Sequence, residues 1–249
     1  MSERKDQHVL RGERISKNFG GISALTDVDF NLEEGEIVGL IGPNGSGKST
    51  LFNVITKLLH PDGGNLFFKG KEITHMKTHE ICKLGIARTF QEIRTFKEMT
   101  TLENVLAGVY FRYRGLAVGK AHQIKEAQAL LHAVNLSAKQ DALAKDLSLV
   151  DQRRLEIARA LSLHPSLLLL DEVLAGLIPG EVEQALEMIY RIKESLSLTI
   201  FIIEHNIKAL TKLCTRIIVL NYGEKIAEGS PSDVVKNPSV MQAYLGEKV

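Results

Sequence analysis

Cysteine, tryptophan and long apolar runs are scarce in this chain of 249 residues. It has two cysteines, Cys82 and Cys214, and no tryptophan. The cysteines lack the spacing of a metal site or a redox pair, so we interpret them as reduced thiols of a cytosolic protein. No apolar run approaches the roughly 18 residues of a membrane span, and residues 1–7 are polar. Any membrane role is therefore expected to act from the surface, through another protein.

An excess of charge of one sign is also missing. Lysine and arginine number 31 and the acidic residues 30, which gives a net charge of +1. A nucleic-acid-binding face needs clustered basic residues, so the charge balance argues against nucleic acid as the main partner. The apolar content of 44% suffices for a sizeable core, in one large α/β domain or a domain with an inserted subdomain.

The most informative motif is a glycine-rich run between a strand-like stretch, Glu36 to Ile41, and a helix-like one, Leu51 to Leu59. It reads Gly42-Pro43-Asn44-Gly45-Ser46-Gly47-Lys48-Ser49-Thr50 and fits the phosphate-binding pattern G-x-x-x-x-G-K-[ST]. Glycine lets several backbone N–H groups turn toward one polyphosphate. Lys48 adds a point charge, Ser49 offers a hydroxyl to Mg²⁺, and the following helix presents its free amides. The motif predicts a site for a nucleoside triphosphate.

A second motif supplies carboxylates. The apolar run Leu167 to Leu170 predicts a buried strand that ends at Asp171 and Glu172. Asp171 would hold Mg²⁺, directly or through water, and Glu172 would serve the attacking water. An apolar run that ends in Asp-Glu is also common at exposed strand ends, so the catalytic interpretation depends on the phosphate loop that precedes it.

The remaining segments predict an α/β fold. Leu10 to Asn31 suggests two antiparallel strands, and the short strand Asn65 to Lys69 is expected to join their sheet. Strands that alternate with helices imply a largely parallel sheet covered on both faces. The other expected elements are strands Ile86–Gln91 and Leu198–Ile203, helices Glu181–Ser195 and Ile207–Leu213, and a hairpin of Arg216–Leu220 and Glu224–Glu228 around Asn221-Tyr222-Gly223.

Helical spacing dominates from Glu92 to about Pro165. Three segments carry it: Thr101–Arg112, Lys120–Val134 and Gln152–Leu163. We therefore expect residues 1–249 to form a single domain with a helical subdomain inserted at about residues 92–165.

These motifs together resemble the nucleotide-binding subunit of an ATP-binding cassette (ABC) transporter over nearly the whole chain. Five further features lie in the family's order: Phe19 in Ser16-Lys17-Asn18-Phe19-Gly20, Gln91 after Ala87-Arg88-Thr89-Phe90, Leu147-Ser148 before the helix Gln152 to Ala160, Ala175-Gly176-Leu177 after the carboxylates, and His205 in Ile203-Glu204-His205-Asn206. Taken singly, Phe19 would be a core residue, Gln91 a solvated edge residue and His205 a surface histidine. Their joint order favours the functional interpretation.

The resemblance implies a P-loop NTPase (RecA-like) core with a mostly parallel sheet, an antiparallel β subdomain and the helical insertion. It implies that Phe19 stacks on adenine, that His205 contacts the γ-phosphate, and that Gln91 reaches Mg²⁺ and touches the membrane partner. The metal would lie among Ser49, Gln91 and Asp171. Residues 42–50 and Ser148 would bind ATP, and Glu172, His205 and Gln91 would serve catalysis.

The resemblance also implies partners and a place in the cell. Two ATP-binding subunits would close on two Mg-ATP, and hydrolysis would reopen them and drive permease subunits in the membrane. The chain would lie at the cytoplasmic face of the plasma membrane as a peripheral subunit. Soluble ABC ATPases of DNA repair or translation are expected to carry a coiled-coil insert or tandem cassettes, and this chain shows neither.

Within the family, the sequence is similar to the ATPases of high-affinity branched-chain amino-acid importers. Two segments carry this similarity. One is Ala87 to Gln91 with the following Arg94, Phe96, Met99 and Thr100 to Val105, and the other is the tail from Asn237 to Glu247. The tail is shared with the ATPase of lipopolysaccharide export, which stays open as an alternative, as does a nucleotide-binding regulatory module that does not hydrolyse ATP.

Two positions depart from the family pattern. Val150 stands where the signature segment has glycine, and Ile178 where Asp or Asn would touch the partner subunit. A β-branched residue fills space and resists unusual φ values, and a lost amide contact to phosphate would be worth about 1.5–3 kcal/mol. Both departures lie on elements offered to the partner, so we hypothesise a heterodimer with two unequal sites. The alternative is that Val150 is tolerated because Ser148 and the helix amides suffice.

Overall fold

The computed structural model describes residues 8–245, which divide into two compact units. The first unit comprises the described parts of Met1–Ile81 and Leu198–Val249, and the second is Cys82–Ser197. Within the described residues, no helix is both long and apolar enough to span a bilayer.

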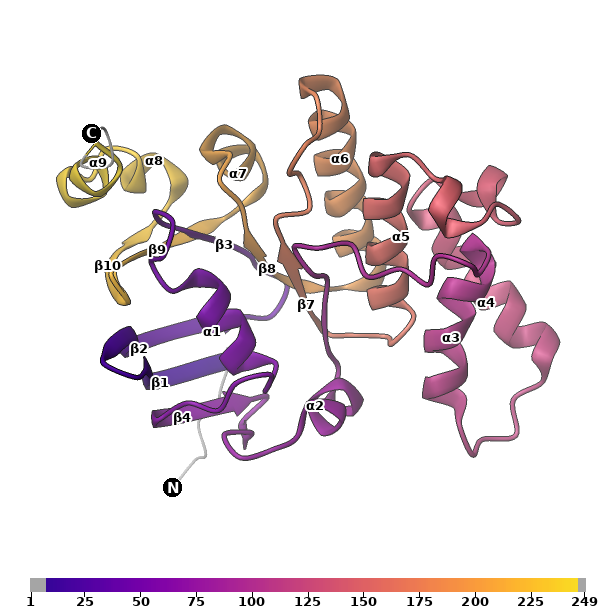
Figure 1. Ribbon diagram of the computed structural model, residues 1–249, viewed down its shortest axis with the longest axis horizontal. Helices are drawn as coiled ribbons and strands as arrows, with labels where there is room; N and C mark the ends of the chain where they lie inside the picture. Colours follow the sequence, from indigo (N-terminus) through magenta and orange to yellow (C-terminus); the bar gives the residue numbers. More distant parts are fainter. Residues whose placement is uncertain (1–7, 246–249) are drawn as a thin grey trace. The chain divides into compact units, whose positions relative to one another are not determined.

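An antiparallel sheet opens the first unit. Its strand order is β2-β1-β4-β5, with β1 at His8–Phe19, β2 at Ile22–Glu33, β4 at Gly63–Phe68 and β5 at Lys71–Glu72 (Figure 1). A Cβ on Gly12 would lie 2.2 Å from Cε1 of Phe30, so glycine lets β1 accept that ring at close range. The two expected antiparallel strands, and the third that joins them, are confirmed.

A parallel sheet forms the core of the first unit. Strand β3 (Ile37–Ile41) pairs in parallel with β8 (Thr199–Ile203) and with β9 (Arg216–Asn221). All residues of β3 and β8 are buried, as expected for parallel strands covered on both faces. Phe201 of β8 contacts Phe52 of helix α1, with ring centroids 5.1 Å apart.

The remaining elements of this unit follow the parallel strands. Helix α1 is Lys48–Ile55 and α7 is Ile207–Leu213. Strand β10 (Glu224–Gly229) pairs antiparallel with β9, which confirms the predicted hairpin. Two helices that sequence periodicity missed, α8 (Pro231–Val234) and α9 (Pro238–Leu245), end the described chain.

The second unit is mainly helical. Strand β6 (Ile86–Arg88) pairs in parallel with β7 (Leu167–Asp171). Helices α3, α4 and α5 pack against one another (Figure 1), and α6 follows β7. Their bounds are α3 Thr101–Tyr113, α4 Lys120–Ala133, α5 Leu149–Leu161 and α6 Pro179–Leu196, with short 3₁₀ turns at Ser137–Lys139 and Ala144–Asp146. The three helices expected between residues 92 and 165 are confirmed. Helix α2 (Thr78–Leu84) was not predicted.

Element ends differ from the prediction where one residue overrides periodicity. Helix α1 ends at Ile55 rather than Leu59, because Lys57 adopts the left-handed conformation with φ 57°. Helix α5 begins at Leu149 rather than Gln152, because the Ser148 side chain accepts the Asp151 N–H and caps the helix there. Strand β6 ends at Arg88, short of Gln91.

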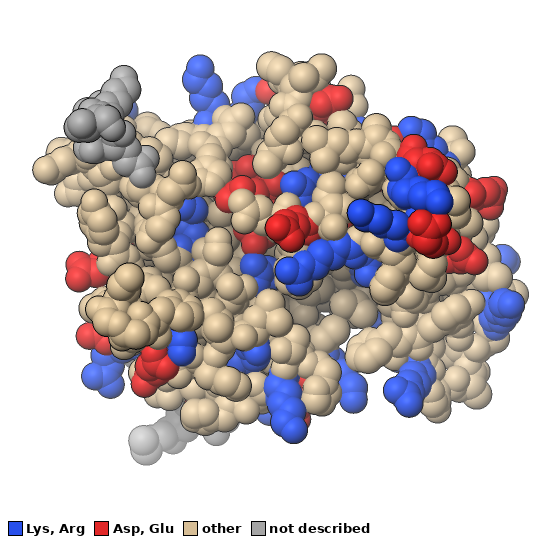
Figure 2. All heavy atoms as spheres, viewed as in Figure 1, with Lys and Arg blue, Asp and Glu red and all other residues tan. Residues whose placement is uncertain are grey.

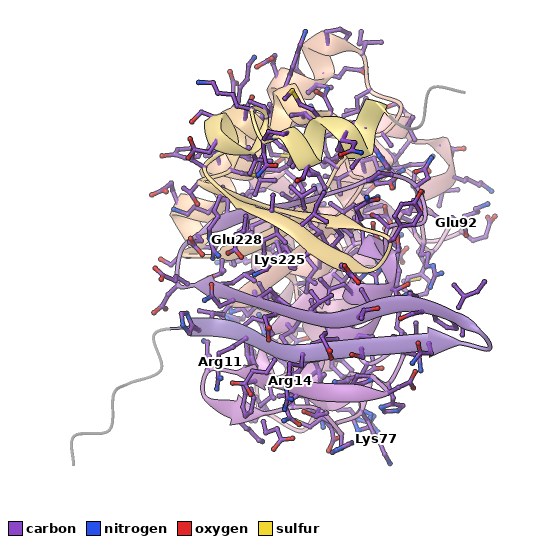
Figure 3. All side chains as sticks on the ribbon, turned by 90° about the vertical axis from the view of Figure 1, so that its left-hand side faces the viewer. Arg11, Arg14, Lys77, Glu92, Lys225 and Glu228 are labelled. Atoms are coloured by element: carbon purple, nitrogen blue, oxygen red, sulfur yellow. The ribbon has the colours of Figure 1, made fainter. Side chains whose placement is uncertain are left out.

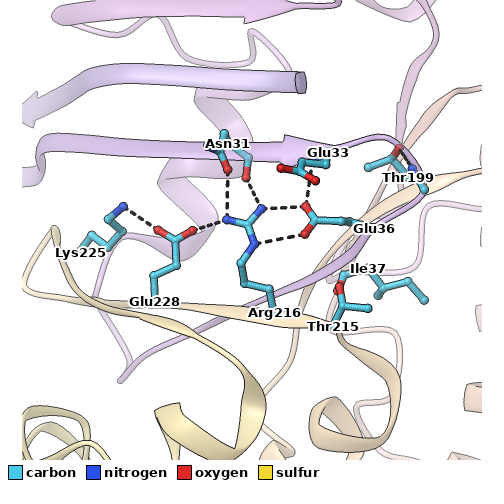
Figure 4. A network of polar contacts seen from close by, with 10 residues as sticks. Asn31, Glu33, Glu36, Ile37, Thr199, Thr215, Arg216, Lys225 and Glu228 are labelled. Atoms are coloured by element: carbon cyan, nitrogen blue, oxygen red, sulfur yellow. Dashed lines mark hydrogen bonds and ion pairs between the residues drawn. The ribbon is translucent and has the colours of Figure 1, made fainter. Parts of the chain in front are cut away.

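Arg216 on β9 joins four segments of the first unit (Figure 4). Its guanidinium donates to both carboxylate oxygens of Glu36, at 2.7 and 3.3 Å, and to the backbone oxygen of Asn31 at 2.9 Å. It also pairs with Glu228 of β10, and Lys225 contacts the same carboxylate at 2.7 Å; Figure 3 labels both residues. Burial alone would lower the pKa of Arg216, but the bonds to Glu36 and Glu228 outweigh it and raise this pKa.

We predict that Arg216→Lys lowers the free energy of unfolding by about 2–4 kcal/mol, because lysine cannot make the bidentate bond and leaves half-buried carboxylates short of donors. Urea denaturation measures the change. Lys225→Met is the matched control, since that pair is more exposed and is expected to contribute under about 1 kcal/mol. Equal losses from both variants would contradict the central role of Arg216.

Lys57, just past the end of α1, carries a buried amine. The residue is 5% exposed, and its Nζ has no hydrogen-bond partner among the described residues. Burial, opposed by the charge of Glu72, lowers the pKa of Lys57 to about 8. A group whose pKa is lower in the folded state than in the unfolded state disfavours folding below that pKa, because the folded state then holds the charge at a cost.

We therefore predict that Lys57→Met is more stable than the natural chain at pH 7, by about 1–3 kcal/mol. The difference should shrink between pH 8 and pH 10, since the folded chain releases the Lys57 proton there while the unfolded chain keeps it. Denaturation at several pH values measures this, with exposed Lys236→Met as the control. A gap that widens with rising pH would refute the prediction.

Candidate functional site

The phosphate loop lies in the first unit, between β3 and α1. Gly42, Gly45 and Gly47 have positive φ angles of 152°, 75° and 103°. A Cβ on Gly42 would lie 2.1 Å from the backbone oxygen of Leu220, and one on Gly47 would lie 2.5 Å from that of Ala24. Gly42 and Gly47 therefore require glycine both for their dihedral angles and for the close backbone approach, and Gly45 for its dihedral angle alone.

Neighbouring segments fix the shape of the loop. The Gly223 N–H, in the turn between β9 and β10, donates to the Ser46 oxygen at 3.1 Å, and the Gly223 oxygen accepts from the Thr26 N–H at 2.9 Å. Gly47 is the N-cap of α1 and has no side chain that could accept a hydrogen bond from the first amides of the helix. A helix start of this kind attracts anions.

Lys48 is buried inside the loop. Its Nζ donates to the backbone oxygens of Gly42 at 2.7 Å and Pro43 at 2.8 Å, and only 6% of the residue is exposed. Ser49 is exposed and Thr50 is half-buried. The loop thus gathers one ammonium group, one accessible hydroxyl and a helix N-terminus within a few residues.

Two more candidates lie in the first unit. Phe19, the last residue of β1, is 46% exposed, and Lys17 Nζ lies 5.7 Å from its ring centroid. An exposed ring at a strand end can offer a face to a planar base. His205 is exposed just after β8, and the next residue, Asn206, caps α7 by accepting the Ala209 N–H at 3.0 Å.

The second unit carries the carboxylates. Asp171 ends β7 and is 2% exposed. Its Oδ2 pairs with Arg88 of the adjacent β6 at 2.6 Å, and its N–H donates to Thr89 Oγ1 at 3.0 Å. The other oxygen, Oδ1, is buried with no hydrogen-bond partner among the described residues.

Glu172 is held in an uncommon conformation next to Asp171. Its φ is 51°, in the left-handed region that L-residues seldom adopt outside constrained sites. The Gln91 amide donates to Glu172 Oε2 at 3.0 Å. The structure therefore brings Gln91 and Glu172 together.

Mg²⁺ fits the carboxylates of the second unit. A buried oxygen without a hydrogen-bond partner, Asp171 Oδ1, suits a cation as its partner, and Mg²⁺ prefers oxygen ligands from one or two carboxylates together with phosphates. Ser49 and Gln91, the other predicted ligands, also offer oxygen atoms. The meeting of Lys48 with Asp171 stays a prediction, because the two residues belong to different units.

The signature segment is ordered differently from the expectation. Ser148 caps α5, and its hydroxyl donates to Asp151 Oδ2 at 2.9 Å. Val150 lies in the first turn of α5 and is not among the residues with positive φ. Val150 therefore needs no unusual φ in this conformation, and the bulk of its side chain is what distinguishes it from glycine here.

Ile178 stands at the N-cap of α6 and is 64% exposed. Its N–H donates to Glu181 Oε2 at 3.0 Å, but its side chain has no acceptor for the helix amides. This position exposes an apolar side chain where the family pattern has a polar one.

Sequence reasoning missed several residues that hold the predicted ones. Arg88 and Thr89 fix Asp171, while Asp151 fixes Ser148. Only the last carries a readable signal, since a serine followed three residues later by an acidic residue is a helix-capping pattern. Acidic and basic side chains are interspersed over the helical part at the right of Figure 2, in keeping with the balanced composition.

Comparisons with known proteins cover nearly the whole chain. The sequence pattern of the "ABC transporter" family matches residues 25–175, and that of the "Branched-chain amino acid ATP-binding cassette transporter" matches residues 224–249. The "High-affinity branched-chain amino acid transport ATP-binding protein" BraF of Pseudomonas aeruginosa is 37% identical, over 96% of this chain and 98% of BraF. LivG of Escherichia coli is 36% identical, over 97% of this chain and 99% of LivG.

Solved structures agree. The ADP conformation of MJ1267, "an ATP-binding cassette of an ABC transporter", has a TM-score of 0.87 and 35% identity over 96% of this chain and 99% of that one. A dimeric cassette, MJ0796 "bound to ADP and Pi", has a TM-score of 0.80 and 30% identity over 89% of this chain and 98% of that one. The fold is therefore the ABC ATPase fold that the motifs predicted. The chain belongs to the ATP-binding proteins of ABC transporters, in the branched-chain amino-acid transport group.

Proposed function

We propose that this chain hydrolyses Mg-ATP to drive the import of branched-chain or related amino acids through a membrane ABC transporter. The observation that carries the proposal is the phosphate loop, with its left-handed glycines and the buried Lys48 at the start of α1. The names of the relatives and the match at residues 224–249 support the cargo class over lipopolysaccharide export. The chain is then an ATPase subunit at the cytoplasmic face of the plasma membrane.

In the proposed mechanism, the triphosphate binds across the loop amides and the N-terminus of α1. Lys48 exchanges its bonds to the Gly42 and Pro43 oxygens for phosphate oxygens, and Phe19 stacks on the base. Ser49, Gln91 and Asp171 would hold Mg²⁺, which neutralises phosphate charge when it is bound. This arrangement needs the two units to share one nucleotide.

Glu172 acts on the attacking water. The Gln91 amide fixes one carboxylate oxygen of Glu172, and a carboxylate so oriented can accept a proton from water or align it in line with the γ-phosphate. His205 contacts the γ-phosphate. Retention of Glu172 beside Gln91 favours turnover over a regulatory module that only binds nucleotide.

The proposed assembly has two ATP-binding subunits and a permease pair. Residues 1–249 form one ABC nucleotide-binding domain, in which the helical segment at about residues 92–165 is a subdomain. Each nucleotide lies between the phosphate loop of one subunit and the Ser148 region of the other. The relative MJ0796 is a dimer in its structure, which supports this arrangement.

Unequal sites follow from the two departures. Val150 adds bulk beside Ser148, and Ile178 exposes an apolar side chain at the start of α6. Both would face the nucleotide that the partner subunit holds. The site built from this chain's own phosphate loop is then the competent one when the partner carries the ordinary signature residues.

We predict that Lys48→Ala weakens ATP binding at least about 100-fold, because phosphate charge loses its buried cationic partner. Titration of a fluorescent ATP analogue with Mg²⁺ measures the affinity. Lys236→Ala, which removes an exposed lysine of the same unit, should leave binding unchanged. Unchanged affinity in Lys48→Ala would remove the basis of the proposal.

We further predict that Glu172→Gln lowers single-turnover hydrolysis by about 10²–10⁴-fold with ATP binding intact, since a neutral amide cannot accept a proton from water. The assembled transporter is the material, and the matching change in the second ATPase subunit is the comparison. A much smaller loss from the partner's change supports unequal sites. Equal losses would count against them.

A further inference from the structure

Helix α5 holds a short peptide that belongs to no helix or strand. The peptide runs from Phe90 to Arg94, after β6, and α5 contacts both of its ends. Arg153 donates to the Phe90 oxygen at 3.2 Å, and Glu156 Oε1 accepts the Arg94 N–H at 2.9 Å. Arg159 donates to the Arg94 oxygen, so both polar groups of one backbone residue are held by α5.

The three side chains that bind the peptide, those of Arg153, Glu156 and Arg159, share one face of α5. Positions 153, 156 and 159 are three residues apart, a spacing that aligns side chains along a helix. Glu156 is the middle one and is 5% exposed, and its second oxygen accepts from Arg153 at 3.3 Å. Burial raises the pKa of Glu156, although the Arg94 N–H and Arg153 oppose the rise. Buried ion pairs seldom add net stability to a fold. We therefore interpret these contacts as holding the peptide backbone in position.

The peptide held by α5 also contacts the carboxylate of Glu172, and the residues just before it contact Asp171. Gln91 lies between Phe90 and Arg94, and its amide donates to Glu172 at 3.0 Å. Arg88 and Thr89, immediately before the peptide, hold Asp171. Residues 88–94 therefore touch the two carboxylates at the end of β7 and are themselves fastened to α5.

The same helix carries the signature serine. Ser148 caps α5, and Asp151 in its first turn binds Ser148, Lys139 and Arg154. Ser148 and the three side chains that hold the peptide are therefore all placed by α5.

We propose that Glu156 is a positioning residue that sets the Gln91 amide against Glu172 by holding the Arg94 backbone. The inference rests on the proposed function, since it assigns a role within ATP hydrolysis. Glu156 touches neither nucleotide nor water in this account and acts only through the peptide.

A double-mutant cycle in the assembled transporter tests the proposal. We expect Glu156→Gln to lower kcat for ATP about tenfold with little change in KM, because the neutral amide loses the charge-assisted bonds to Arg94 and Arg153 while the phosphate loop is untouched. In a Gln91→Ala background, the same change should cost less than about twofold, since its effect passes through Gln91.

Controls separate positioning from general packing. Arg94→Ala keeps the backbone groups that α5 binds and should stay within about threefold of the natural kcat. Glu187→Gln, an exposed charge loss on α6, should do nothing. Arg159→Met removes the hydrogen bond to the Arg94 oxygen, and its loss of kcat should also depend on the presence of Gln91. This second variant keeps the test valid if Glu156→Gln folds poorly.

Several outcomes would overturn the inference. Equal losses with and without Gln91 would mean that Glu156 only supports the fold. An unchanged kcat in Glu156→Gln, or in Gln91→Ala, would also reject it. The proposed function has its own tests, the Lys48→Ala and Glu172→Gln variants. If the chain still hydrolyses ATP but the double-mutant cycle shows no dependence on Gln91, only the positioning role of Glu156 is rejected.

Discussion

The structure depends most on a backbone constraint, the left-handed glycines of the phosphate loop. Gly42 and Gly47 lie so close to the backbone oxygens of Leu220 and Ala24 that a side chain at either position would clash with them. This contact ties the loop to the hairpin turn and to β2, and it leaves the start of α1 without a side-chain cap. A rigid loop of this kind can present its amides without reorganisation when charge develops, which is the main requirement for phosphoryl transfer.

The second constraint is the hold on the carboxylates. Asp171 and Glu172 are consecutive, yet they have separate restraints: Arg88 and Thr89 act on the first and Gln91 on the second. The left-handed φ of Glu172 turns the chain sharply between them. Such a local conformation persists only where the surroundings over-determine it, and α5 adds to those restraints by fixing the peptide that carries Gln91.

The chemistry could be predicted from sequence wherever it is local. The phosphate loop and the end of β7 each occupy consecutive positions, so their residue types predict their roles. Apolar periodicity misplaces the end of α1 and the start of α5. The left-handed conformation of Lys57 ends the first helix early, and the Ser148 cap starts the second one early. Contacts across long separations leave no such pattern: Arg88 meets Asp171 83 positions later, and the Arg94 N–H meets Glu156 62 positions later.

We propose that Lys48 and Asp171 serve one magnesium-bound triphosphate. A crystal structure of the Glu172→Gln chain with Mg²⁺ and ATP tests it most directly, because the variant retains the nucleotide. We expect a single nucleotide whose phosphates contact Lys48 Nζ and whose metal is bound by Asp171, directly or through one water. A nucleotide at the phosphate loop whose metal lies remote from Asp171 would contradict it.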